Sequence, residues 1–265
     1  MKLQQIIDIL EEIAPPQYAA SWDNSGLQVG SPEAEVSSIL VALDITEGVI
    51  REGARKKTDL IVTHHPLFFH PLSRLQTNTG IGKLLPPLLQ AGISVYAAHT
   101  NLDVAAGGVN DQLGRALKIA RWKELPGGRT SEVKGFGGIG KLEAPRRITE
   151  IITDLKKSLK IPTVRLVGSK EKTVQKIAFC CGSGADLFPE VCRAAPDLFI
   201  TGDLKYHDAM NFLLEGIPAL DLGHFASEAG IRKPLAEKIR QAIYRKGEHL
   251  TVQVSRTERD PFQFI

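Results

Sequence analysis

The strongest constraint on the fold is an alternation of short apolar runs with segments of helical periodicity. Residues 39–43, 60–62 and 93–98 are mostly apolar, and the segment 46–57 between the first two runs has a helical pattern. Strands that are buried on both faces and linked by helices form largely parallel sheets. The chain is therefore predicted to be an α/β protein.

The second half of the chain repeats this order of elements. In the first half, a strand-like motif that begins at Val36 precedes one that begins at Asp59 by 23 positions. In the second half, a motif that begins at Val174 precedes one that begins at Asp197 by the same 23 positions. The echo predicts two related α/β lobes with mixed, largely parallel sheets, and chance similarity between two parallel-sheet units is the alternative. Further helices are expected at residues 2–13, 80–91, 147–159, 186–194, 205–215 and 226–246, and further strands at 164–167, 177–181, 198–200, 218–222 and 250–254.

A glycine-rich stretch separates the two predicted lobes. Residues 126–140 contain six glycines, but neither a strand-to-helix context nor a Gly-Lys-Ser/Thr ending accompanies them. A glycine-rich strand or hinge is therefore favoured over a phosphate-binding loop. The expected lobes are residues 1–125 and 126–265.

Composition limits the classes of function. No apolar run approaches the length of a membrane span, and the first residues contain no apolar signal core. We therefore expect a cytoplasmic protein without membrane contact. Cys180, Cys181 and Cys192 lack metal-knuckle spacing and are predicted to be buried free thiols. The net charge of +3 permits a phosphate-bearing ligand but gives only weak support for binding to nucleic acid.

Histidines follow three of the predicted strands directly. His64 and His65 follow the run that ends at Thr63, while His99 and His224 follow the strands at 93–98 and 218–222. In open α/β sheets, ligands bind beyond the carboxyl ends of the strands, so side chains far apart in sequence converge there. The pattern predicts that these histidines share the crevice between the lobes.

Two of these histidines have a carboxylate four residues later. Asp103 follows His99, and Glu228 follows His224, which is a spacing that places both groups on one face of a helix or tight turn. Imidazole and carboxylate groups without thiolate are ligands for Zn, Mn, Fe or Ni. Five or six such ligands exceed the needs of one tetrahedral ion, so the count favours two divalent metal ions, with Asp103 or Glu228 bridging them.

The adjacent histidines are expected to serve different ions. Side chains of neighbouring residues in an extended chain point to opposite sides, and Pro66 favours an extended conformation at His65. Strand-end polar groups and helix-capping carboxylates are the alternative interpretation of the whole set. His207 is a candidate proton donor or ligand-orienting group, whereas His70 and His249 have weaker support.

Five motifs along the chain resemble those of a known family, the dinuclear metal-centre proteins called GTP cyclohydrolase I type 2 homologues. They occur in the family order and span most of the sequence. The motifs are Trp22-Asp23-Asn24-Ser25-Gly26-Leu27, Thr63-His64-His65-Pro66-Leu67-Phe68-Phe69, His99-Thr100-Asn101-Leu102-Asp103, Thr201-Gly202-Asp203 with Tyr206-His207-Asp208-Ala209, and Gly223-His224 with Ser227-Glu228.

The resemblance implies a two-lobed α/β subunit and a ring-shaped homohexamer whose sites face an internal cavity. Some members have a large inserted domain near the middle, and the short stretch between Trp122 and Phe136 leaves no room for it, so the chain resembles the short form. His70 stands where a lysine or another polar residue is expected. The metal ligands that the resemblance implies are His64, His65, Asp103, His224 and Glu228.

The leading functional hypothesis is a metal-dependent hydrolase that acts on a nucleotide-like small molecule. Two ions would activate a water molecule, and His99 or His207 would move protons as catalytic groups. GTP ring opening is implied by the resemblance, although the metal motifs specify activation of water and do not specify a purine. The alternative is a non-enzymatic ring that stores or delivers metal, or a scaffold that binds nucleic acid or protein partners.

Overall fold

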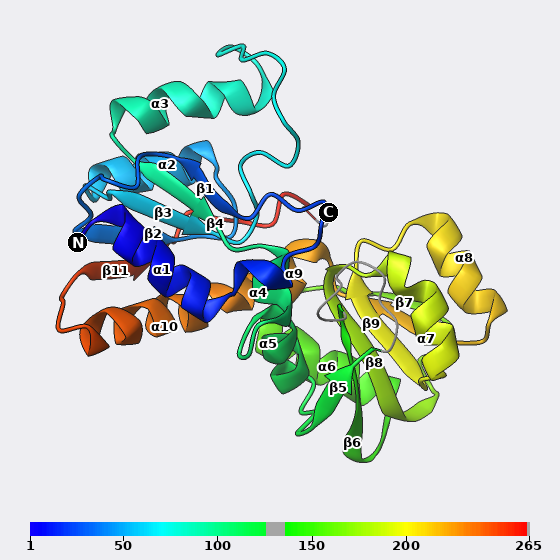
Figure 1. Cartoon of the computed structure of the whole chain (residues 1–265). Helices are drawn as coiled ribbons and strands as arrows, with labels where there is room; N and C mark the ends of the chain where they lie inside the picture. Colours follow the sequence, from blue (N-terminus) through cyan, green and yellow to red (C-terminus); the bar gives the residue numbers. More distant parts are fainter. Residues whose placement is uncertain (126–135, 264–265) are drawn as a thin grey trace. The chain divides into compact units, whose positions relative to one another are not determined.

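The structure is a computed structural model that describes residues 1–125 and 136–263 (Figure 1). The chain forms two compact units, Met1–Ala106 with Ile231–Arg259, and Gly107–Gly230 with Asp260–Ile265. This division differs from the predicted boundary between residues 125 and 126. The difference arises because the strand Thr251–Val254, from the end of the chain, joins the sheet of the first unit. The strand Trp122–Glu124, which precedes the predicted boundary, joins the sheet of the second unit.

The first unit is built on a five-stranded sheet in the order β1-β4-β3-β2-β11. Its strands β2, β3, β4 and β11 are parallel, and β1 is antiparallel to β4 at one edge. The elements of this unit are α1 (Leu3–Ile13), β1 (Gly26–Val29), β2 (Ser38–Val41), α2 (Glu47–Arg55), β3 (Leu60–Thr63), α3 (Leu85–Gln90), β4 (Ser94–Ala97), α4 (Thr100–Val104), α10 (Arg232–Arg245) and β11 (Thr251–Val254), with 3-10 turns at Pro16–Tyr18 and Gly80–Leu84.

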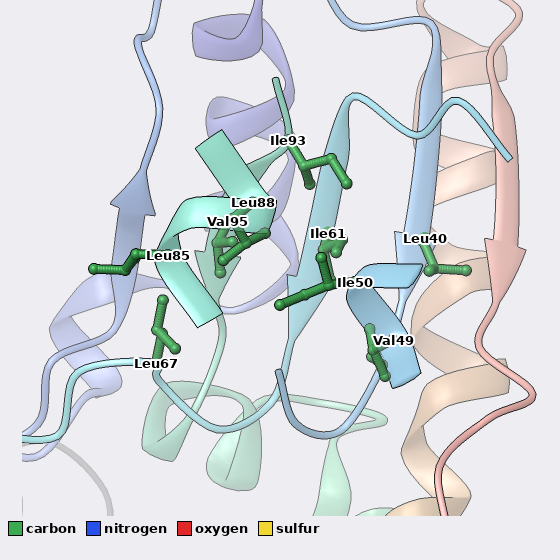
Figure 2. Packing of buried hydrophobic residues seen from close by; sticks show 10 residues of the cluster. Leu40, Val49, Ile50, Ile61, Leu67, Leu85, Leu88, Ile93 and Val95 are labelled. Atoms are coloured by element: carbon green, nitrogen blue, oxygen red, sulfur yellow. The ribbon is translucent and has the colours of Figure 1, made fainter. Parts of the chain in front are cut away.

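Helices cover both faces of this sheet. Leu40, Ile61 and Val95 lie side by side in register on β2, β3 and β4. Their side chains pack against α2 and α3, as Figure 2 shows. Helices α1 and α10 contact each other, and α10 also contacts β2 and β11 (Figure 1). Because both faces are covered, the central strands β2, β3 and β4 are buried along their whole length and lack the two-residue alternation of a half-exposed sheet.

The second unit is built on a six-stranded sheet in the order β5-β6-β8-β9-β10-β7. Strands β8, β9 and β10 are parallel, whereas β5, β6 and β7 join by antiparallel pairs. The elements of this unit are α5 (Val109–Ala116), β5 (Trp122–Glu124), β6 (Gly138–Arg147), α6 (Ile148–Leu159), β7 (Arg165–Val167), β8 (Thr173–Ser183), α7 (Phe188–Ala194), β9 (Leu198–Gly202), α8 (Tyr206–Leu214), β10 (Ala219–Asp221) and α9 (His224–Glu228), with a 3-10 turn at Ala185–Leu187.

The two sheets repeat one local design, as the 23-residue echo predicts. In the first unit, Asp59 Oδ2 accepts hydrogen bonds from the backbone N–H groups of Ser37 and Ser38 at 2.8 and 3.0 Å. In the second, Asp197 Oδ2 accepts from Gln175 and Lys176 at 2.9 and 2.8 Å. Each aspartate thereby aligns the start of one parallel strand with the start of the next. The prediction of an α/β fold with two related, mixed sheets is confirmed.

One predicted helix is interrupted in the structure. The helical pattern over residues 226–246 is divided into α9 and α10 by a 3-10 turn at Ala229–Ile231. Pro234 has no N–H to bond the carbonyl of Gly230, and its ring would clash there, so a continuous helix cannot pass. At residues 80–91 the prolines lie in the first turn of α3, where proline is tolerated.

The glycine-rich stretch becomes part of a strand where the structure describes it. β6 begins at Gly138, and a Cβ added there would come within 2.6 Å of the Phe179 and Trp122 rings. Glycine is therefore required for close packing at this position, and residues 126–135 lie outside the described residues.

The three cysteines are free thiols, with Cys180 and Cys181 buried. Among the described residues, no helix is both long and apolar enough to span a bilayer.

Candidate metal centre

The histidine pair lies in a bend immediately after β3. The amide N–H of His65 donates to the carbonyl of Leu43 at 3.0 Å, and the Thr63 hydroxyl donates to the carbonyl of His65 at 2.7 Å. These bonds fix the bend beyond the strand. The ring centroids of His64 and His65 are 4.9 Å apart. The expected opposite orientation of the two side chains is therefore wrong, because the residues lie in a bend and not in an extended strand.

His99 and Asp103, the other predicted site residues of the first unit, lie at the short helix α4. His99 caps the N-terminus of α4, and its carbonyl accepts from the amides of Leu102 and Asp103 at 2.9 and 3.2 Å. The turn carries Asp103 back toward the histidine pair, where its Oδ1 lies 3.5 Å from His64 Nε2. Asp103 thus lies beside one histidine of the pair.

Three histidines of the first unit form one compact group. The ring centroids of His64 and His65 lie 5.2 and 5.6 Å from that of His99. Each ring offers a nitrogen, and these three nitrogens lie within 4.8 Å of one another. All three residues are buried. Such a spacing suits a shared metal ion, so the geometry of His99 is compatible with ligation as well as with proton transfer.

The second unit carries the other predicted pair on α9. His224 is the first residue of this helix and Glu228 the last, and His224 Nε2 lies 3.1 Å from Glu228 Oε2. Gly182 makes room for this carboxylate, since a Cβ at that position would lie 2.2 Å from Glu228 Oε1. The backbone of Gly182 has a φ of +59°, and this left-handed conformation also favours glycine.

All four histidines are oriented in the same way. The Nδ1 atom of His64 contacts the carbonyl oxygen of Ala98 at 2.9 Å. In the other three, Nδ1 contacts a carboxylate oxygen. These partners are Asp44 for His65 at 2.8 Å, Asp23 for His99 at 2.7 Å, and Asp203 for His224 at 2.7 Å. Carbonyl and carboxylate oxygens only accept, so each Nδ1 is the donor, and each neutral ring presents the lone pair of Nε2.

This orientation fits metal binding. In the neutral state, the lone pair of His224 Nε2 faces the Glu228 carboxylate, and that of His64 faces Asp103. Two lone pairs at such distances repel each other unless a proton or a cation lies between them. Metal-binding histidines in proteins characteristically donate Nδ1–H to a carboxylate or carbonyl. The residues present therefore match the donor set that a metal ion prefers.

Asp23 anchors the loop that holds His99. Its side chain is fully buried, and besides His99 it accepts hydrogen bonds from the backbone and hydroxyl of Thr100 and the hydroxyl of Ser25. Burial by itself would raise the pKa of Asp23, but the hydrogen bonds from His99, Thr100 and Ser25, with the positive charge that His99 carries when protonated, outweigh it and hold the pKa well below its usual range. The carboxylate is thus ionised and orients the imidazole.

A second buried aspartate fixes the loop that holds His224. Asp221 accepts from the amides of Leu204 and Gly223 at 3.0 and 2.8 Å and from the guanidinium of Arg165. These bonds tie the turn before α9 to the loop after β9. That loop places Asp203 in the left-handed region, with a φ of +56°, beside His224.

Two other histidines belong to none of the groups of possible metal ligands among the described residues. His207 is exposed on α8, where its ring packs against Tyr206 at a centroid distance of 5.3 Å. His70 is exposed in the loop after the histidine pair. The sequence did not single out Asp44. Its position directly after the apolar run 39–43 is the same strand-end signal that identified the histidines.

The chain is similar to known proteins along almost its whole length. The family model described as Duf34/NIF3 (NGG1p interacting factor 3) matches residues 1–261. A curated relative from Clostridium perfringens, named GTP cyclohydrolase 1 type 2 homolog, is 37% identical over 265 residues and 100% of both chains.

Solved structures share the fold. A Staphylococcus aureus protein aligns with a TM-score of 0.91 at 27% identity, over 100% of this chain and 99% of its own. A Bacillus cereus protein related to NIF3 aligns with a TM-score of 0.92 and 23% identity over the same shares, which is a likeness of fold alone. Because the Duf34/NIF3 family model matches this chain along almost the whole length of the chain, this chain belongs to the Duf34/NIF3 family.

Proposed function

We propose that this protein is a metal-dependent hydrolase acting on a nucleotide-like small molecule. His64, His65 and Asp103 of the first unit, with His224 and Glu228 of the second, would hold two divalent ions. The observation that carries the proposal is the common donation from Nδ1 in His64, His65, His99 and His224, which makes Nε2 the acceptor atom of each ring for a metal ion or a proton.

Divalent ions held by such ligands supply Lewis acidity and lower the pKa of bound water, which is the chemistry that hydrolysis needs. The protein's own groups prepare that chemistry. Asp44, Asp23 and Asp203 fix the tautomer and orientation of three histidines. His99, buried and paired with an ionised carboxylate, is the proposed proton carrier at Nε2.

The nucleotide-like substrate is supported by the name of the Clostridium perfringens relative, GTP cyclohydrolase 1 type 2 homolog. Family likeness is a warrant by association, because one fold hosts many chemistries. GTP itself is therefore one member of the substrate panel. The ring-shaped homohexamer stays a prediction, which light scattering in solution would test.

The test begins with protein purified without chelator or a nickel-affinity tag. Elemental analysis should find close to two equivalents of Zn, Mn, Fe or Ni per chain. A panel of nucleoside mono-, di- and triphosphates and phosphoesters is then assayed with each metal. We expect turnover by the wild type and its loss in His64→Ala and Glu228→Gln.

The control is His249→Ala, which removes an imidazole near the C-terminus outside the proposed ligand set. It should keep both metal and turnover. Absence of turnover on the whole panel with fully loaded protein would count against a hydrolase. Readily exchangeable metal without turnover would favour metal storage or delivery instead.

A further inference from the structure

Two aromatic side chains of the first unit flank His99 and stay exposed. The centroid of the Trp22 ring lies 6.0 Å from that of His99, and the centroid of Phe69 lies 5.5 Å away, both in edge-to-face orientation. Trp22 is 58% exposed and Phe69 46% exposed. Large aromatic surface left in water beside a buried polar cluster is a feature of ligand-binding sites.

A cavity of about 500 Å³ lies at these two rings. This volume falls within the usual range for small-molecule sites. The aromatic and apolar lining surrounds polar groups of Asp23 and Asn24. The lining residues are Trp22, Asp23, Asn24, Phe68, Phe69, Pro71 and Leu72.

The loops that carry the two rings are joined to each other by side-chain hydrogen bonds. Asn24 Nδ2 donates to the carbonyl oxygen of Phe68 at 2.6 Å, and the amide of Phe68 donates to Gln28 Oε1 at 3.3 Å. Gln28 Nε2 in turn donates to the carbonyl of Asn24 at 2.7 Å. The backbone next to each aromatic residue is therefore fixed before any ligand binds, which lowers the entropy cost of binding.

The same loop that carries Trp22 also orients His99. Asp23 follows Trp22 directly and binds His99 Nδ1 at 2.7 Å. The aromatic pocket and the candidate metal centre therefore share a wall. A ligand ring in the pocket would therefore lie next to His99 and the histidine group to which it belongs.

We propose that Trp22 and Phe69 form a clamp for a planar heteroaromatic ring of the substrate. Stacking on aromatic side chains recognises the flat face of a nucleobase or a similar ring without requiring a particular pattern of hydrogen bonds. This inference rests on the proposed function and deepens it. It assigns substrate selection to the ring and leaves the reaction to the metal ligands.

Binding is tested without turnover, by calorimetry on the full-length, metal-loaded protein. The probes are guanosine, adenosine and cytidine monophosphates, with ribose 5-phosphate as the matched ligand that lacks a ring. Wild-type protein should bind at least one mononucleotide about tenfold or more tightly than ribose 5-phosphate. Trp22→Leu and Phe69→Leu should each reduce that preference by about tenfold, since leucine keeps apolar bulk but removes the stacking face.

Two further variants keep the test specific. Trp22→Tyr should restore most of the preference because it restores an aromatic face. Tyr244→Leu removes an exposed aromatic ring from α10, outside the pocket, and should leave the preference unchanged. Equal binding of mononucleotides and ribose 5-phosphate by the wild type, or unchanged preference in both leucine variants, would overturn the clamp. So would a change of oligomer size in Trp22→Leu, because the rings would then serve contacts between chains.

Failure of the clamp can be distinguished from failure of the proposed hydrolase. Ring-dependent binding without turnover on any substrate would contradict the hydrolase and keep the clamp. Turnover that depends on His64 and Glu228 but is indifferent to Trp22→Leu and Phe69→Leu would contradict the clamp and keep the hydrolase.

Discussion

Asp203 Oδ2 lies 2.7 Å from Nδ1 of His224, and the aspartate holds a left-handed backbone conformation to reach it. We predict that Asp203→Gly lowers metal affinity by about 10- to 100-fold, the usual effect of losing such an outer partner. Glycine suits the φ of +56°, so the variant removes the acceptor without adding backbone strain. Competition with a chromophoric chelator would measure the affinity.

The conservative variant Asp203→Asn provides the comparison. Asparagine tolerates the left-handed region and keeps an acceptor oxygen without the charge, so it should fall between wild type and Asp203→Gly. Equal affinity in all three proteins would show that the imidazole is oriented by its other contacts.

A second prediction concerns Gly182. An alanine there would place its Cβ 2.2 Å from Glu228 Oε1 and force the carboxylate to move. We predict that Gly182→Ala loses at least tenfold in metal affinity and a comparable factor in any hydrolytic activity. The same chelator competition and the activity panel would measure both.

Gly216→Ala is the matched control for this change. Gly216 also has a positive φ, +67°, but nothing lies within 4 Å of an added Cβ. Both variants therefore carry the cost of a left-handed alanine, on the order of 1 kcal/mol, and only Gly182→Ala displaces the carboxylate. Similar metal loss in both would assign the effect to backbone strain.

The sequence was informative for side chains whose positions depend on neighbouring residues in the chain. His99 with Asp103 and His224 with Glu228 follow from one turn of helix after a strand, and that turn is set by residues next to them in the chain. Strand ends were predictable because burial on both faces makes β2, β3 and β4 continuous apolar runs.

The partners of the histidines were harder to predict, because they depend on contacts between distant loops. Asp44 reaches His65 from another strand end, and Asp23 reaches His99 across 76 positions. A surface aspartate and one that orients an imidazole look alike in sequence. The division between α9 and α10 was missed for a different reason. The helical spacing of apolar residues continues across Gly230, and only the backbone chemistry of Pro234 interrupts it.

A third prediction tests the repeated design of the two sheets. Asp59→Ala and Asp197→Ala each leave two strand-start amides without their carboxylate acceptor. We expect each change to lower the free energy of unfolding by about 1–3 kcal/mol, since it removes two hydrogen bonds to a charged, half-buried acceptor. Urea titrations followed by circular dichroism would measure it.

Asp8→Ala is the control for these two variants, since Asp8 is exposed on α1 and accepts a hydrogen bond from the side chain of Gln4, also on the surface of that helix. A surface change of this kind should stay within about 0.5 kcal/mol of wild type. If Asp59→Ala and Asp197→Ala behaved like Asp8→Ala, the aspartates would not be the equivalent anchors of the two sheets.

The last prediction concerns the acid stability of the first unit. Glu52 of α2 is buried and binds the segment that follows β11, accepting from the Ser255 hydroxyl at 2.8 Å and the amide of Arg256 at 3.0 Å. Burial would raise its pKa, but these bonds and Lys56 outweigh it and lower the pKa to about 2. Because the folded-state pKa lies below the ordinary value, the unfolded chain binds the proton more readily. Glu52 therefore stabilises the fold above about pH 4.5, and this contribution is lost as the pH falls toward 2.

Replacement of Glu52 by glutamine should remove that dependence. We expect Glu52→Gln to lose on the order of 2 kcal/mol of unfolding free energy at pH 7, with the gap to wild type closing as the pH falls from 4.5 toward 2. Glu47→Gln, on the exposed first turn of the same helix, should follow the wild-type curve. Urea unfolding at several pH values between 2.5 and 7 would measure the three curves. A constant gap between Glu52→Gln and wild type at every pH would mean that the carboxylate acts through packing and not through its charge.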